Sequence, residues 1–527
     1  MTHAVAAGHP LTAATMGDVL DEGGTAVAAV VAGAAVAMVA EPVLAGLFGG
    51  GFLMLREPAG RTRLLDLFVD TPARRRAQAE CRLDEVDADF GPTRQRFRIG
   101  PASVASAGLA PGLAEAHARQ GRMPMAELLG PAIRAAREGV RLTAYQARLS
   151  GIVAPILTAT PEARALHADE DGRPLGEGAI RRNPDFAEVL EIWGIEGADF
   201  VQRGEVAAAL AEQTAAHGHL TREDLARWRP VYRAPLETER GAMRLWLNPP
   251  PALGGALIAL SLALIPRDAP PAVVAEAFAL NALARRDSRI DADPVAGAAR
   301  LAEPRRLDNW RALLRGPAGG WLAAARARPS ATRGTTPLSA VDAEGRAAAL
   351  TLSNGEGCGL IVPGTGIMAN NMLGEDDLVP DDPFAWTPGV RLASMMAPTL
   401  IAWPDGRVAA LGSGGSNRIR TALARVLARL ADATPPGRLP DLEAAIMAPR
   451  LHVEGTGEAA RLDYERDGRA EDDERALVER WPEACDEPRG WDAPSMFFGG
   501  VHAVARARDG RVEAVADPRR DGAARRS

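Results

Sequence analysis

The sequence predicts an α/β fold whose second half is rich in strands. Helices and short strands alternate in the first segment, and the pattern from about residue 142 to 283 is mostly helical. Strand-length apolar runs then appear at 347–352, 399–402 and 408–411. Spacing alone supports this mixture of elements and no finer architecture.

The first segment is expected to form two helices followed by two buried strands. Residues 11–21 carry apolar side chains at helical spacing and end at a pair of glycines. Residues 25–39 are apolar on nearly every side, so this helix should be buried. A glycine turn feeds a buried strand within residues 46–55, and residues 64–69 form the next strand.

Later segments continue the same mixture. Helices are predicted at 108–118 and 126–138, and residues 342–345 predict a hairpin turn. Residues 286–332 are rich in Arg, Ala and Pro and are predicted to be partly flexible, as expected before a cleavage point. The remaining predictions are helices at 419–431 and 442–448 and strands at 451–453 and 501–505.

Composition excludes several classes of function. The net charge is −7, so no broad basic surface for nucleic acid is expected. All 61 basic residues are arginines, which excludes mechanisms that need a lysine, such as a Schiff base or a P-loop. No cofactor is expected.

No metal site, disulfide framework or membrane segment is expected. Cys81, Cys358 and Cys485 lack metal-like spacing, and His217 with His219 has no apparent third ligand. The apolar run 26–40 is shorter than the about 20 residues of a membrane span. The N-terminus lacks the pattern of a signal peptide, so a cytoplasmic protein is the default expectation.

The segment Gly334-Thr335-Thr336 gives the strongest indication of chemistry. A threonine hydroxyl in mid-chain is a poor nucleophile. If the peptide bond before Thr335 is cut, its own α-amine, with a pKa of about 7.7–8.0 in model peptides, can accept the hydroxyl proton. The chain would then be a precursor whose active site forms only after self-cleavage.

The residues that follow strengthen this interpretation. A glycine-rich loop spans 353–359, and further motifs lie at 362–367 and at Asn370-Asn371. Together they resemble the start of the small subunit in the γ-glutamyltranspeptidase family of N-terminal-nucleophile hydrolases. Other segments match the family in the same order: 7–10, 23–29, 41–42, 49–52, 111–112, 124, 127–133, 498–501 and 516–522.

The resemblance implies a four-layer αββα sandwich and a self-cleaved precursor. Residues 1–334 would form the large-subunit-like segment and 335–527 the small-subunit-like segment, which begins with the nucleophile. The halves would stay together as a heterodimer, possibly as a dimer of these. The implied reaction cleaves a γ-glutamyl amide of the glutathione type and transfers the acyl group to water, an amino acid or a peptide.

Catalytic roles follow by motif. Gly334 precedes the cut and Thr335 matches the nucleophile. Ser353 stands where the family has a hydroxyl residue close to the nucleophile, with a turn-forming role as the alternative. Gly414 and Gly415 resemble the loop whose backbone N–H groups bind the oxyanion, and a shift of one residue would make Gly415 and Ser416 the donors. A plain turn before a helix is the other interpretation of this loop.

Substrate-binding residues also follow from the family motifs. Asp377 matches the acid that binds the substrate amine, with Asp376 or Glu375 as alternatives because the register there is blurred. Asn354 takes the place of the family's amine-binding Asn. The family has two serines in succession at this point, and here they correspond to Ala393 and Ser394, so only the second hydroxyl is kept.

Two departures from the family pattern weaken the γ-glutamyl assignment. Phe68 stands where the family has an arginine that holds the substrate α-carboxylate. Arg74, Arg75 and Arg76 follow it, either reaching back to the site or forming a solvated cluster. Pro337 replaces a histidine. The first departure favours an amidohydrolase or acylase with a non-glutamyl substrate, and the second favours an uncleaved, catalytically silent binding protein.

Overall fold

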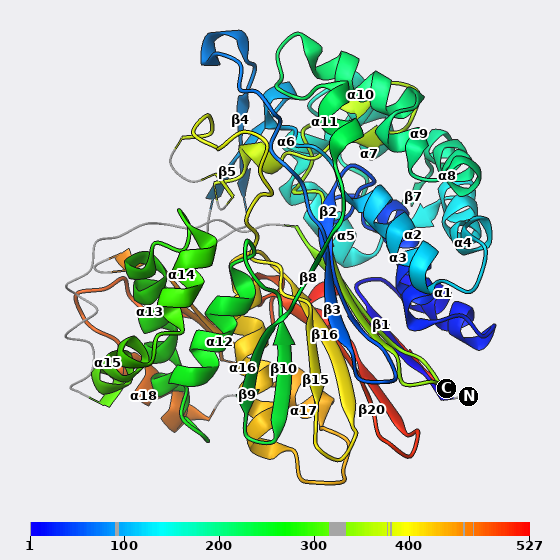
Figure 1. Ribbon diagram of the computed structural model, residues 1–527. Coiled ribbons are helices and arrows are strands. Elements are labelled where there is room, and N and C mark those ends of the chain that lie inside the picture. The colour runs from blue at the N-terminus through cyan, green and yellow to red at the C-terminus, as the bar shows by residue number, and fades with distance from the viewer. Residues whose placement is uncertain are drawn as a thin grey trace.

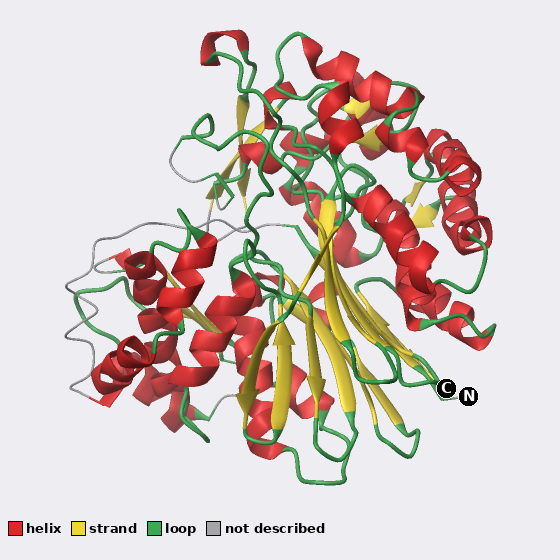
Figure 2. Cartoon of the chain, in the orientation of Figure 1, coloured by secondary structure: helices red, strands yellow, loops and turns green. Residues whose placement is uncertain are grey.

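Two antiparallel sheets packed face to face form the middle of the molecule, and helices cover the outer face of each (Figure 1). The computed structural model describes residues 2–89, 94–315, 334–376, 378–379, 382–456, 459–466, 468 and 470–527. The four-layer αββα sandwich implied by the sequence is confirmed. Figure 2 shows the strands side by side with helices on both sides.

The first sheet has seven strands and joins the two ends of the chain. Its spatial order is β22 (Ala523–Arg526), β1 (Ala4–Ala7), β11 (Thr336–Val341), β12 (Ala347–Ser353), β2 (Gly50–Arg56), β3 (Thr62–Leu67) and β8 (Val231–Arg233). Every neighbouring pair is antiparallel. Because β22 pairs with β1, the N- and C-termini lie side by side (Figure 1).

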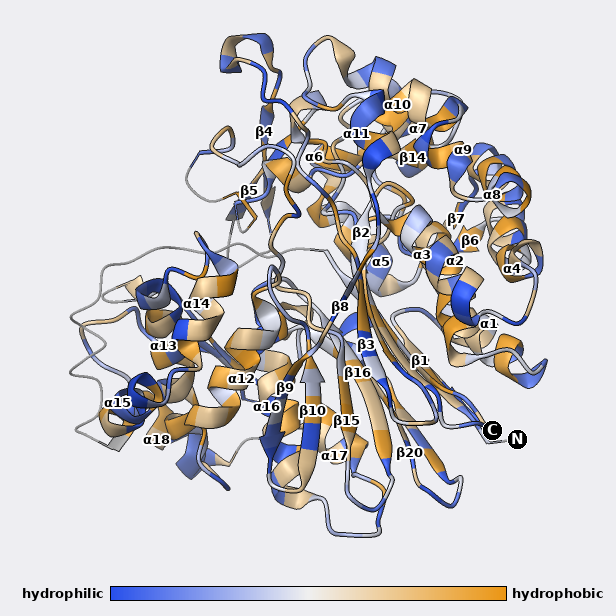
Figure 3. Cartoon of the chain, viewed as in Figure 1, coloured by the Kyte–Doolittle hydropathy of each residue, from blue (hydrophilic) through white to orange (hydrophobic). Residues whose placement is uncertain are grey.

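The second sheet has six antiparallel strands. Its order is β21 (Val512–Val515), β20 (Gly500–Arg506), β16 (Val408–Gly414), β15 (Thr399–Ala402), β10 (Met243–Leu247) and β9 (Leu236–Arg240). Strands β11 and β12 of the first sheet lie against β16. In Figure 3, hydrophobic residues run along most of the central strands, whereas the edge strand β9 is largely hydrophilic.

Alternation along the strands builds two cores. In β11, Leu338 and Ala340 face the helices, whereas Val341 faces the second sheet. In β12, Leu350 faces the helices and Ala349 the second sheet. Both faces of these central strands are therefore buried, which explains why their sequences are almost continuously apolar.

The first helical layer is built around α2 (Ala26–Ala40), which packs on β11 and β12. All its residues are buried, so the predicted burial of this helix is confirmed. The other helices on this side are α1 (Pro10–Asp21), α3 (Leu109–Gln120), α4 (Met125–Glu138), α5 (Ala144–Ile152), α6 (Ala154–Leu157), α7 (Pro161–His167), α8 (Pro184–Glu196), α9 (Asp199–Gln202), α10 (Glu205–Ala215) and α11 (Arg222–Arg227).

The second helical layer covers the other sheet. It contains α12 (Gly254–Leu264), α13 (Pro271–Ser288), α14 (Pro294–Leu301), α15 (Pro304–Arg315), α16 (Arg418–Ala433), α17 (Leu442–Met447) and α18 (Glu471–Arg480). Part of the segment predicted to be partly flexible thus forms α14 and α15, and its continuation to residue 332 lies outside the described residues. No described helix combines the length and hydropathy needed to cross a membrane.

Short elements complete the fold. The remaining strands are β4 (Asp84–Asp89), β5 (Arg94–Ile99), β6 (Val140–Arg141), β7 (Ile180–Arg181), β13 (Ile361–Val362), β14 (Ile367–Met368), β17 (Leu451–Glu454), β18 (Arg461–Glu465) and β19 (Arg489–Trp491). Short 3₁₀ turns lie at Gln78–Glu80, Pro101–Ser103, Met372–Gly374, Met496–Phe498 and Pro518–Arg520. The predicted hairpin turn joins β11 to β12, where the N–H of Gly345 donates to the carbonyl oxygen of Asp342 at 3.0 Å.

Asp342 links this turn to the start of α2. Its carboxylate accepts a hydrogen bond from the N–H of Ala26 at 3.0 Å and pairs with Arg346 at 2.8 Å. Thr25 caps the same helix end by accepting from the N–H of Ala28. The buried helix end therefore depends on a side chain more than 300 residues away in sequence.

Asp342→Ala should lower the free energy of unfolding by about 1–3 kcal/mol, because it leaves the buried N–H of Ala26 without an acceptor. Urea and thermal unfolding measure the change. The exposed Asp171→Ala variant is the control and should change stability by less than about 0.5 kcal/mol. Equal effects in the two variants would show that Asp342 does not hold the helix end.

Candidate active site

Two hydroxyl side chains meet at one end of the first sheet, on the face toward the second sheet. Thr335 directly precedes β11, and Ser353 is the last residue of β12. The ladder pairs Thr336 with Leu352, so Thr335 and Ser353 lie opposite each other. Both are buried and line the same pocket. The strand register thus brings together two residues that the sequence analysis singled out.

The carbonyl oxygen of Gly334 lies between these two hydroxyls. It accepts a hydrogen bond from Ser353 Oγ at 2.7 Å and from Thr335 Oγ1 at 2.8 Å. On the other side of this residue, the Gly334 N–H donates to the buried carboxylate of Glu356 at 2.8 Å. The Ser353 oxygen is itself fixed by the N–H of Gly355 at 3.0 Å. The predicted cleavage site is thus held by hydrogen bonds, with its carbonyl polarised by two hydroxyl donors.

A glycine turn approaches Thr335 from the second sheet. Gly414 ends β16, and a side chain there would place its Cβ only 2.1 Å from the Thr335 carbonyl oxygen. Gly415 has a φ of +116°, which side chains disfavour, and Ser416 also has a positive φ of 51°. Helix α16 begins two residues later. Close approach and unusual backbone geometry therefore coincide at the predicted oxyanion loop.

The pocket beside Thr335 has a cavity volume of about 30 Å³ and a mainly apolar wall. The wall is formed by Phe68, Met372, Leu378, Met395, Met396 and Ile419, and the polar lining by Gly334, Thr335, Ser353, Glu375, Ser394 and Ser416. No described arginine lines it. The described lining therefore offers apolar contacts, hydroxyl groups and the carboxyl group of Glu375, and it contains no cation.

Phe68 is an integral part of this wall. Its ring stacks on Phe52 with centroids 5.3 Å apart, and the residue is 1% exposed. Its carbonyl oxygen accepts from the indole N–H of Trp228 at 2.9 Å. Ring and backbone are thus both fixed, and the position expected to hold a carboxylate carries a packed aromatic ring.

The basic residues after Phe68 point elsewhere. Arg75 donates to the carbonyl oxygen of Phe384 at 2.5 Å, and Arg76 donates to that of Ala215. Arg74, Arg75 and Arg76 are exposed, and none lines the pocket. These arginines therefore form a solvated cluster and do not reach back to the site.

The predicted substrate-binding residues do not all line the pocket beside Thr335. Ser394 lines the pocket, and its Oγ accepts from the N–H of Met396 at 3.1 Å. Asp377 lies outside the described residues. Of its alternatives, Glu375 is buried in the pocket lining, whereas Asp376 is exposed and pairs with Arg98.

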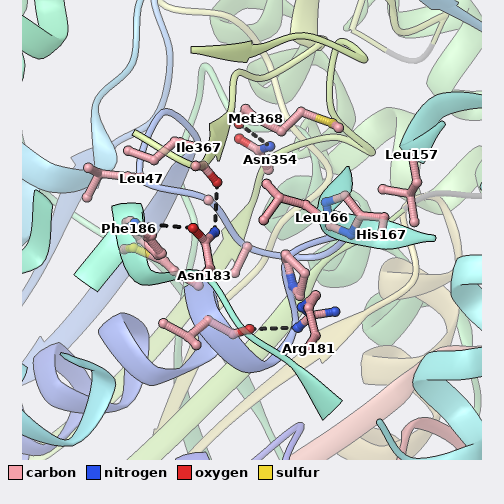
Figure 4. Close-up of a pocket in the computed structure, with 16 residues that line it drawn as sticks. Leu47, Leu157, Leu166, His167, Arg181, Asn183, Phe186, Asn354, Ile367 and Met368 are labelled. Atoms are coloured by element: carbon pink, nitrogen blue, oxygen red, sulfur yellow. Dashed lines mark hydrogen bonds between the residues drawn. The ribbon is translucent and has the colours of Figure 1, made fainter. Parts of the chain in front are cut away.

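Asn354 lies in a different cavity from Thr335. Its side-chain N–H donates to the carbonyl oxygen of Met368 at 3.2 Å (Figure 4). That cavity, with a volume of about 40 Å³, also contains Arg181 and Asn183. Arg181 donates to the carbonyl oxygen of Val39 at 2.7 Å, at the end of α2. The side chain of Asn354 therefore lines a different cavity from the predicted nucleophile, Thr335.

Sequence reasoning gave no role to a carboxyl group that contacts Thr336, the residue after the predicted nucleophile. Glu41 accepts a hydrogen bond from Thr336 Oγ1 at 3.0 Å. A Cβ at Gly8 would lie within 2.6 Å of both groups, so glycine is needed there. Burial raises the pKa of Glu41 to about 8, although the bond from Thr336 opposes this. The only signal was that Glu41 belongs to a family motif; its contact with Thr336 depends on the tertiary fold.

Pro337 is accommodated within β11. It lies opposite Thr351, and β1 ends at Ala7, one residue before the position that would pair with it. A Cβ at Gly412 of β16 would lie 2.8 Å from the proline Cβ, so the ring packs against the second sheet. The proline therefore leaves Thr335 in register with Ser353.

The histidines considered as metal ligands have other contacts. His219 accepts from the N–H of Arg76 at 3.1 Å and lies edge-on to Trp386, while His217 is exposed. Within the described ranges, no group of three or more His, Cys, Asp or Glu side chains is arranged to hold a metal ion.

Known proteins match this chain along almost its whole length. A sequence model described as "Gamma-glutamyltranspeptidase" matches residues 12–527. "Acylase ACY 1 proenzyme" of Pseudomonas sp. (strain SE83) is 31% identical over 98% of this chain and 92% of that protein. "Glutathione hydrolase proenzyme" of Escherichia coli (strain K12) is 27% identical over 85% of this chain and 80% of that protein.

One solved structure has the same fold. It is described as cephalosporin acylase from Bacillus halodurans and superposes with a TM-score of 0.75. The match covers 99% of this chain and 95% of that one at 22% sequence identity. At this level of identity the match supports the fold, and no substrate is inferred from it.

Ser353→Ala should slow cleavage before Thr335 by about 10²–10³-fold, because it removes one of the two donors to the Gly334 carbonyl. Intact mass measured over time after purification gives the rate. Ser353→Thr keeps the hydroxyl and should restore much of the cleavage rate. Ser339→Ala is the matched control, because Ser339 Oγ donates to the His502 carbonyl and not to Gly334. Equal rates in the two alanine variants would contradict this role.

Glu41→Gln should weaken the pH dependence of stability. The protonated carboxyl stabilises the fold fully below its unfolded pKa of about 4.3, and this contribution is lost as the pH rises through the folded pKa of about 8. Between about pH 5 and pH 8 the wild type should therefore lose on the order of 2–4 kcal/mol more than the variant. Unfolding at several pH values tests this, with the exposed Glu177→Gln as control. Parallel curves for wild type and Glu41→Gln would refute the assignment.

Proposed function

Because the chain belongs to the γ-glutamyltranspeptidase family, an N-terminal-nucleophile hydrolase family, we propose that it is a self-processed acylase. It cleaves an amide whose acyl group is uncharged and largely apolar. The observation that carries this proposal is the packed ring of Phe68 in a pocket without a described arginine. The acylase name of one relative agrees with it.

A γ-glutamyl group fits this pocket poorly. Its α-carboxylate is charged and needs a cation or several hydrogen-bond donors when it is taken out of water. The chain has no lysine, and the arginines that follow Phe68, 74–76, are exposed, with Arg75 and Arg76 bonded elsewhere. Leaving such a carboxylate unpaired costs about 1–3 kcal/mol or more. The glutathione-type reaction expected from the family resemblance is therefore the second candidate, supported by the relative named as a glutathione hydrolase.

Self-cleavage is the first proposed step. Thr335 Oγ1 attacks the carbonyl carbon of Gly334, and its hydroxyl already donates a hydrogen bond to the carbonyl oxygen of that residue at 2.8 Å. The hydroxyl proton passes to the amide nitrogen. The peptide C–N bond breaks as an ester forms, and the former amide nitrogen becomes the α-amine of Thr335. Water then hydrolyses the ester, which leaves residues 1–334 with a new carboxylate and Thr335 with a free hydroxyl.

Turnover uses the groups that this cleavage creates. The α-amine takes the proton of Thr335 Oγ1, which attacks the substrate carbonyl. The former carbonyl oxygen of the substrate then carries negative charge and faces the backbone N–H groups of the Gly414–Ser416 turn. The amine proton passes to the departing nitrogen, and an acyl ester remains on Thr335. Water, or the amine of an amino acid or peptide, releases the acyl group.

The two halves remain together after cleavage in this proposal. In the first sheet, β11 of the second half is paired between β1 of the first half and β12. Strand β12 in turn pairs with β2 of the first half, and β10 of the first half pairs with β15 of the second. Separating the halves would break both sheets. A heterodimer of 1–334 and 335–527 is therefore expected.

A panel of anilides should rank apolar acyl groups, such as phenylacetyl, above γ-glutamyl in kcat/KM. Phe68→Arg should reverse this ranking toward γ-glutamyl, because a guanidinium then faces the carboxylate, whereas Phe68→Leu should keep it. Thr335→Ala should lose activity by about 10³-fold or more on every member.

Two results would contradict the proposal. A wild type that prefers the γ-glutamyl anilide would overturn the substrate class and favour the second candidate. Hydrolysis retained by Thr335→Ala would overturn the mechanism itself.

A further inference from the structure

A buried arginine lies behind the glycine turn of the active site. Arg520 is 4% exposed and ends the short 3₁₀ turn after β21. Its guanidinium donates to the carbonyl oxygen of Met496 at 3.3 Å. It forms no ion pair with any residue that the structure describes. The neighbouring Arg519 differs, since it pairs with both Glu465 and Asp517.

Three glycines make room for Arg520. A Cβ at Gly414 would lie 3.1 Å from Nη1, and a Cβ at Gly415 would lie 3.2 Å from Nη2. A Cβ at Gly500, which pairs with Gly414 across the sheet, would lie 2.8 Å from the arginine Cβ. The absence of side chains on both strands therefore creates the space that the guanidinium and its stem occupy.

The same glycine connects Arg520 to the nucleophile. The Cβ position at Gly414 that is 3.1 Å from Arg520 Nη1 is also 2.1 Å from the carbonyl oxygen of Thr335. The guanidinium and the Thr335 carbonyl oxygen therefore both border the space that a side chain at position 414 would fill. At such distances, inside the protein and away from water, a unit charge acts strongly on its surroundings.

The acidic groups nearby do not cancel this charge by direct contact. Glu41, at the end of α2, lies close enough to interact with this charge, but burial raises the pKa of Glu41 to about 8, so it is mostly protonated at neutral pH. Asp517 is paired with Arg450 and Arg519. Tyr145 and His502 also lie close enough to Arg520 to interact with its charge. Asp521 follows Arg520 in the chain and forms no ion pair with it in the described structure.

Burying a cation without an ion pair is costly, so its presence calls for a reason. Packing alone does not supply one, because an apolar side chain of similar volume could fill the same space at lower cost. Negative charge develops on the substrate oxygen during turnover, on the other side of the Gly414–Gly415 turn in the proposed mechanism. A fixed positive charge at this place stabilises that transition state in advance.

Building on the proposed acylase mechanism, we propose that Arg520 is a positioning residue for catalysis. It supports the Gly414–Gly415 turn from behind, and its charge lowers the barrier to formation of the oxyanion. It touches neither substrate nor reacting atoms and acts through the glycine backbone.

Two substitutions separate charge from packing. Arg520→Met keeps much of the volume and removes the charge, whereas Arg520→Lys keeps the charge and loses the planar fork. Arg525→Met is the control, an exposed arginine of the same C-terminal segment that pairs with Asp18 and Asp21. Each variant is measured for its thermal unfolding midpoint, for cleavage before Thr335, and for kcat and KM on an anilide that the wild type hydrolyses.

Arg520→Met should keep its unfolding midpoint within about 4 °C of wild type and its KM within about 3-fold, while kcat falls by at least about 10-fold. Arg520→Lys should recover a substantial part of kcat, and Arg525→Met should match wild type. A merely structural role would lower the unfolding midpoint and would not be rescued by charge.

Three outcomes would overturn the inference. One is a folded Arg520→Met with kcat within about 2-fold of wild type. Another is a folded Arg520→Lys variant whose kcat is no higher than that of Arg520→Met. A pair of folded variants that both remain uncleaved before Thr335 counts as the same outcome. The third is a wild-type protein that hydrolyses no anilide of the panel, which would also overturn the proposed function. If wild type and Arg520→Met are both active, only the role of Arg520 is overturned.

Discussion

The pairing of β11 with β12 is the constraint on which the rest of the site depends. It sets Thr336 opposite Leu352, and this register alone places Thr335 beside Ser353 on the face toward the second sheet. A slip of β11 by one residue would send the Thr335 hydroxyl to the helical side, among the apolar residues of α2, and away from Ser353. The register is fixed from both faces, because Leu338 and Leu350 fill one core while Val341 and Ala349 fill the other.

Three kinds of feature converge on this point. Hydroxyl donors hold the carbonyl of Gly334, a glycine turn from β16 reaches the backbone of Thr335, and an apolar wall containing Phe68 closes the pocket. The first two are compatible with any amide substrate, since they act on the carbonyl group. Only the wall distinguishes acyl groups, so the family and the chemistry can be shared while the substrate changes.

Much of the fold could be predicted from local patterns. The continuous apolar runs of α2 and β12, and the turn at 342–345, are strong signals that need no tertiary information. Gly334-Thr335 and Ser353 could be singled out because they belong to short motifs of the γ-glutamyltranspeptidase family. The four-layer arrangement came from that resemblance, because the spacing of apolar residues does not reveal which sheets face each other.

What could not be predicted depends on contacts between distant segments. Glu41 meets Thr336 across almost 300 residues, and Arg520 reaches the Gly414–Gly415 turn from the C-terminus. Asn354 follows Ser353 directly, yet its side chain enters another cavity, because the chain turns after β12 ends. Such contacts are set by the strand register and by the packing of the two sheets, and neither is visible in local periodicity.

The most direct test of the central claim is the intact mass of the purified protein, with the N-terminal residue of each fragment identified. A live N-terminal nucleophile predicts two fragments, of which the second begins at Thr335, and which remain associated under native conditions. A single full-length chain that stays intact on prolonged incubation at neutral pH would contradict the claim, because the α-amine that activates Thr335 would then never form.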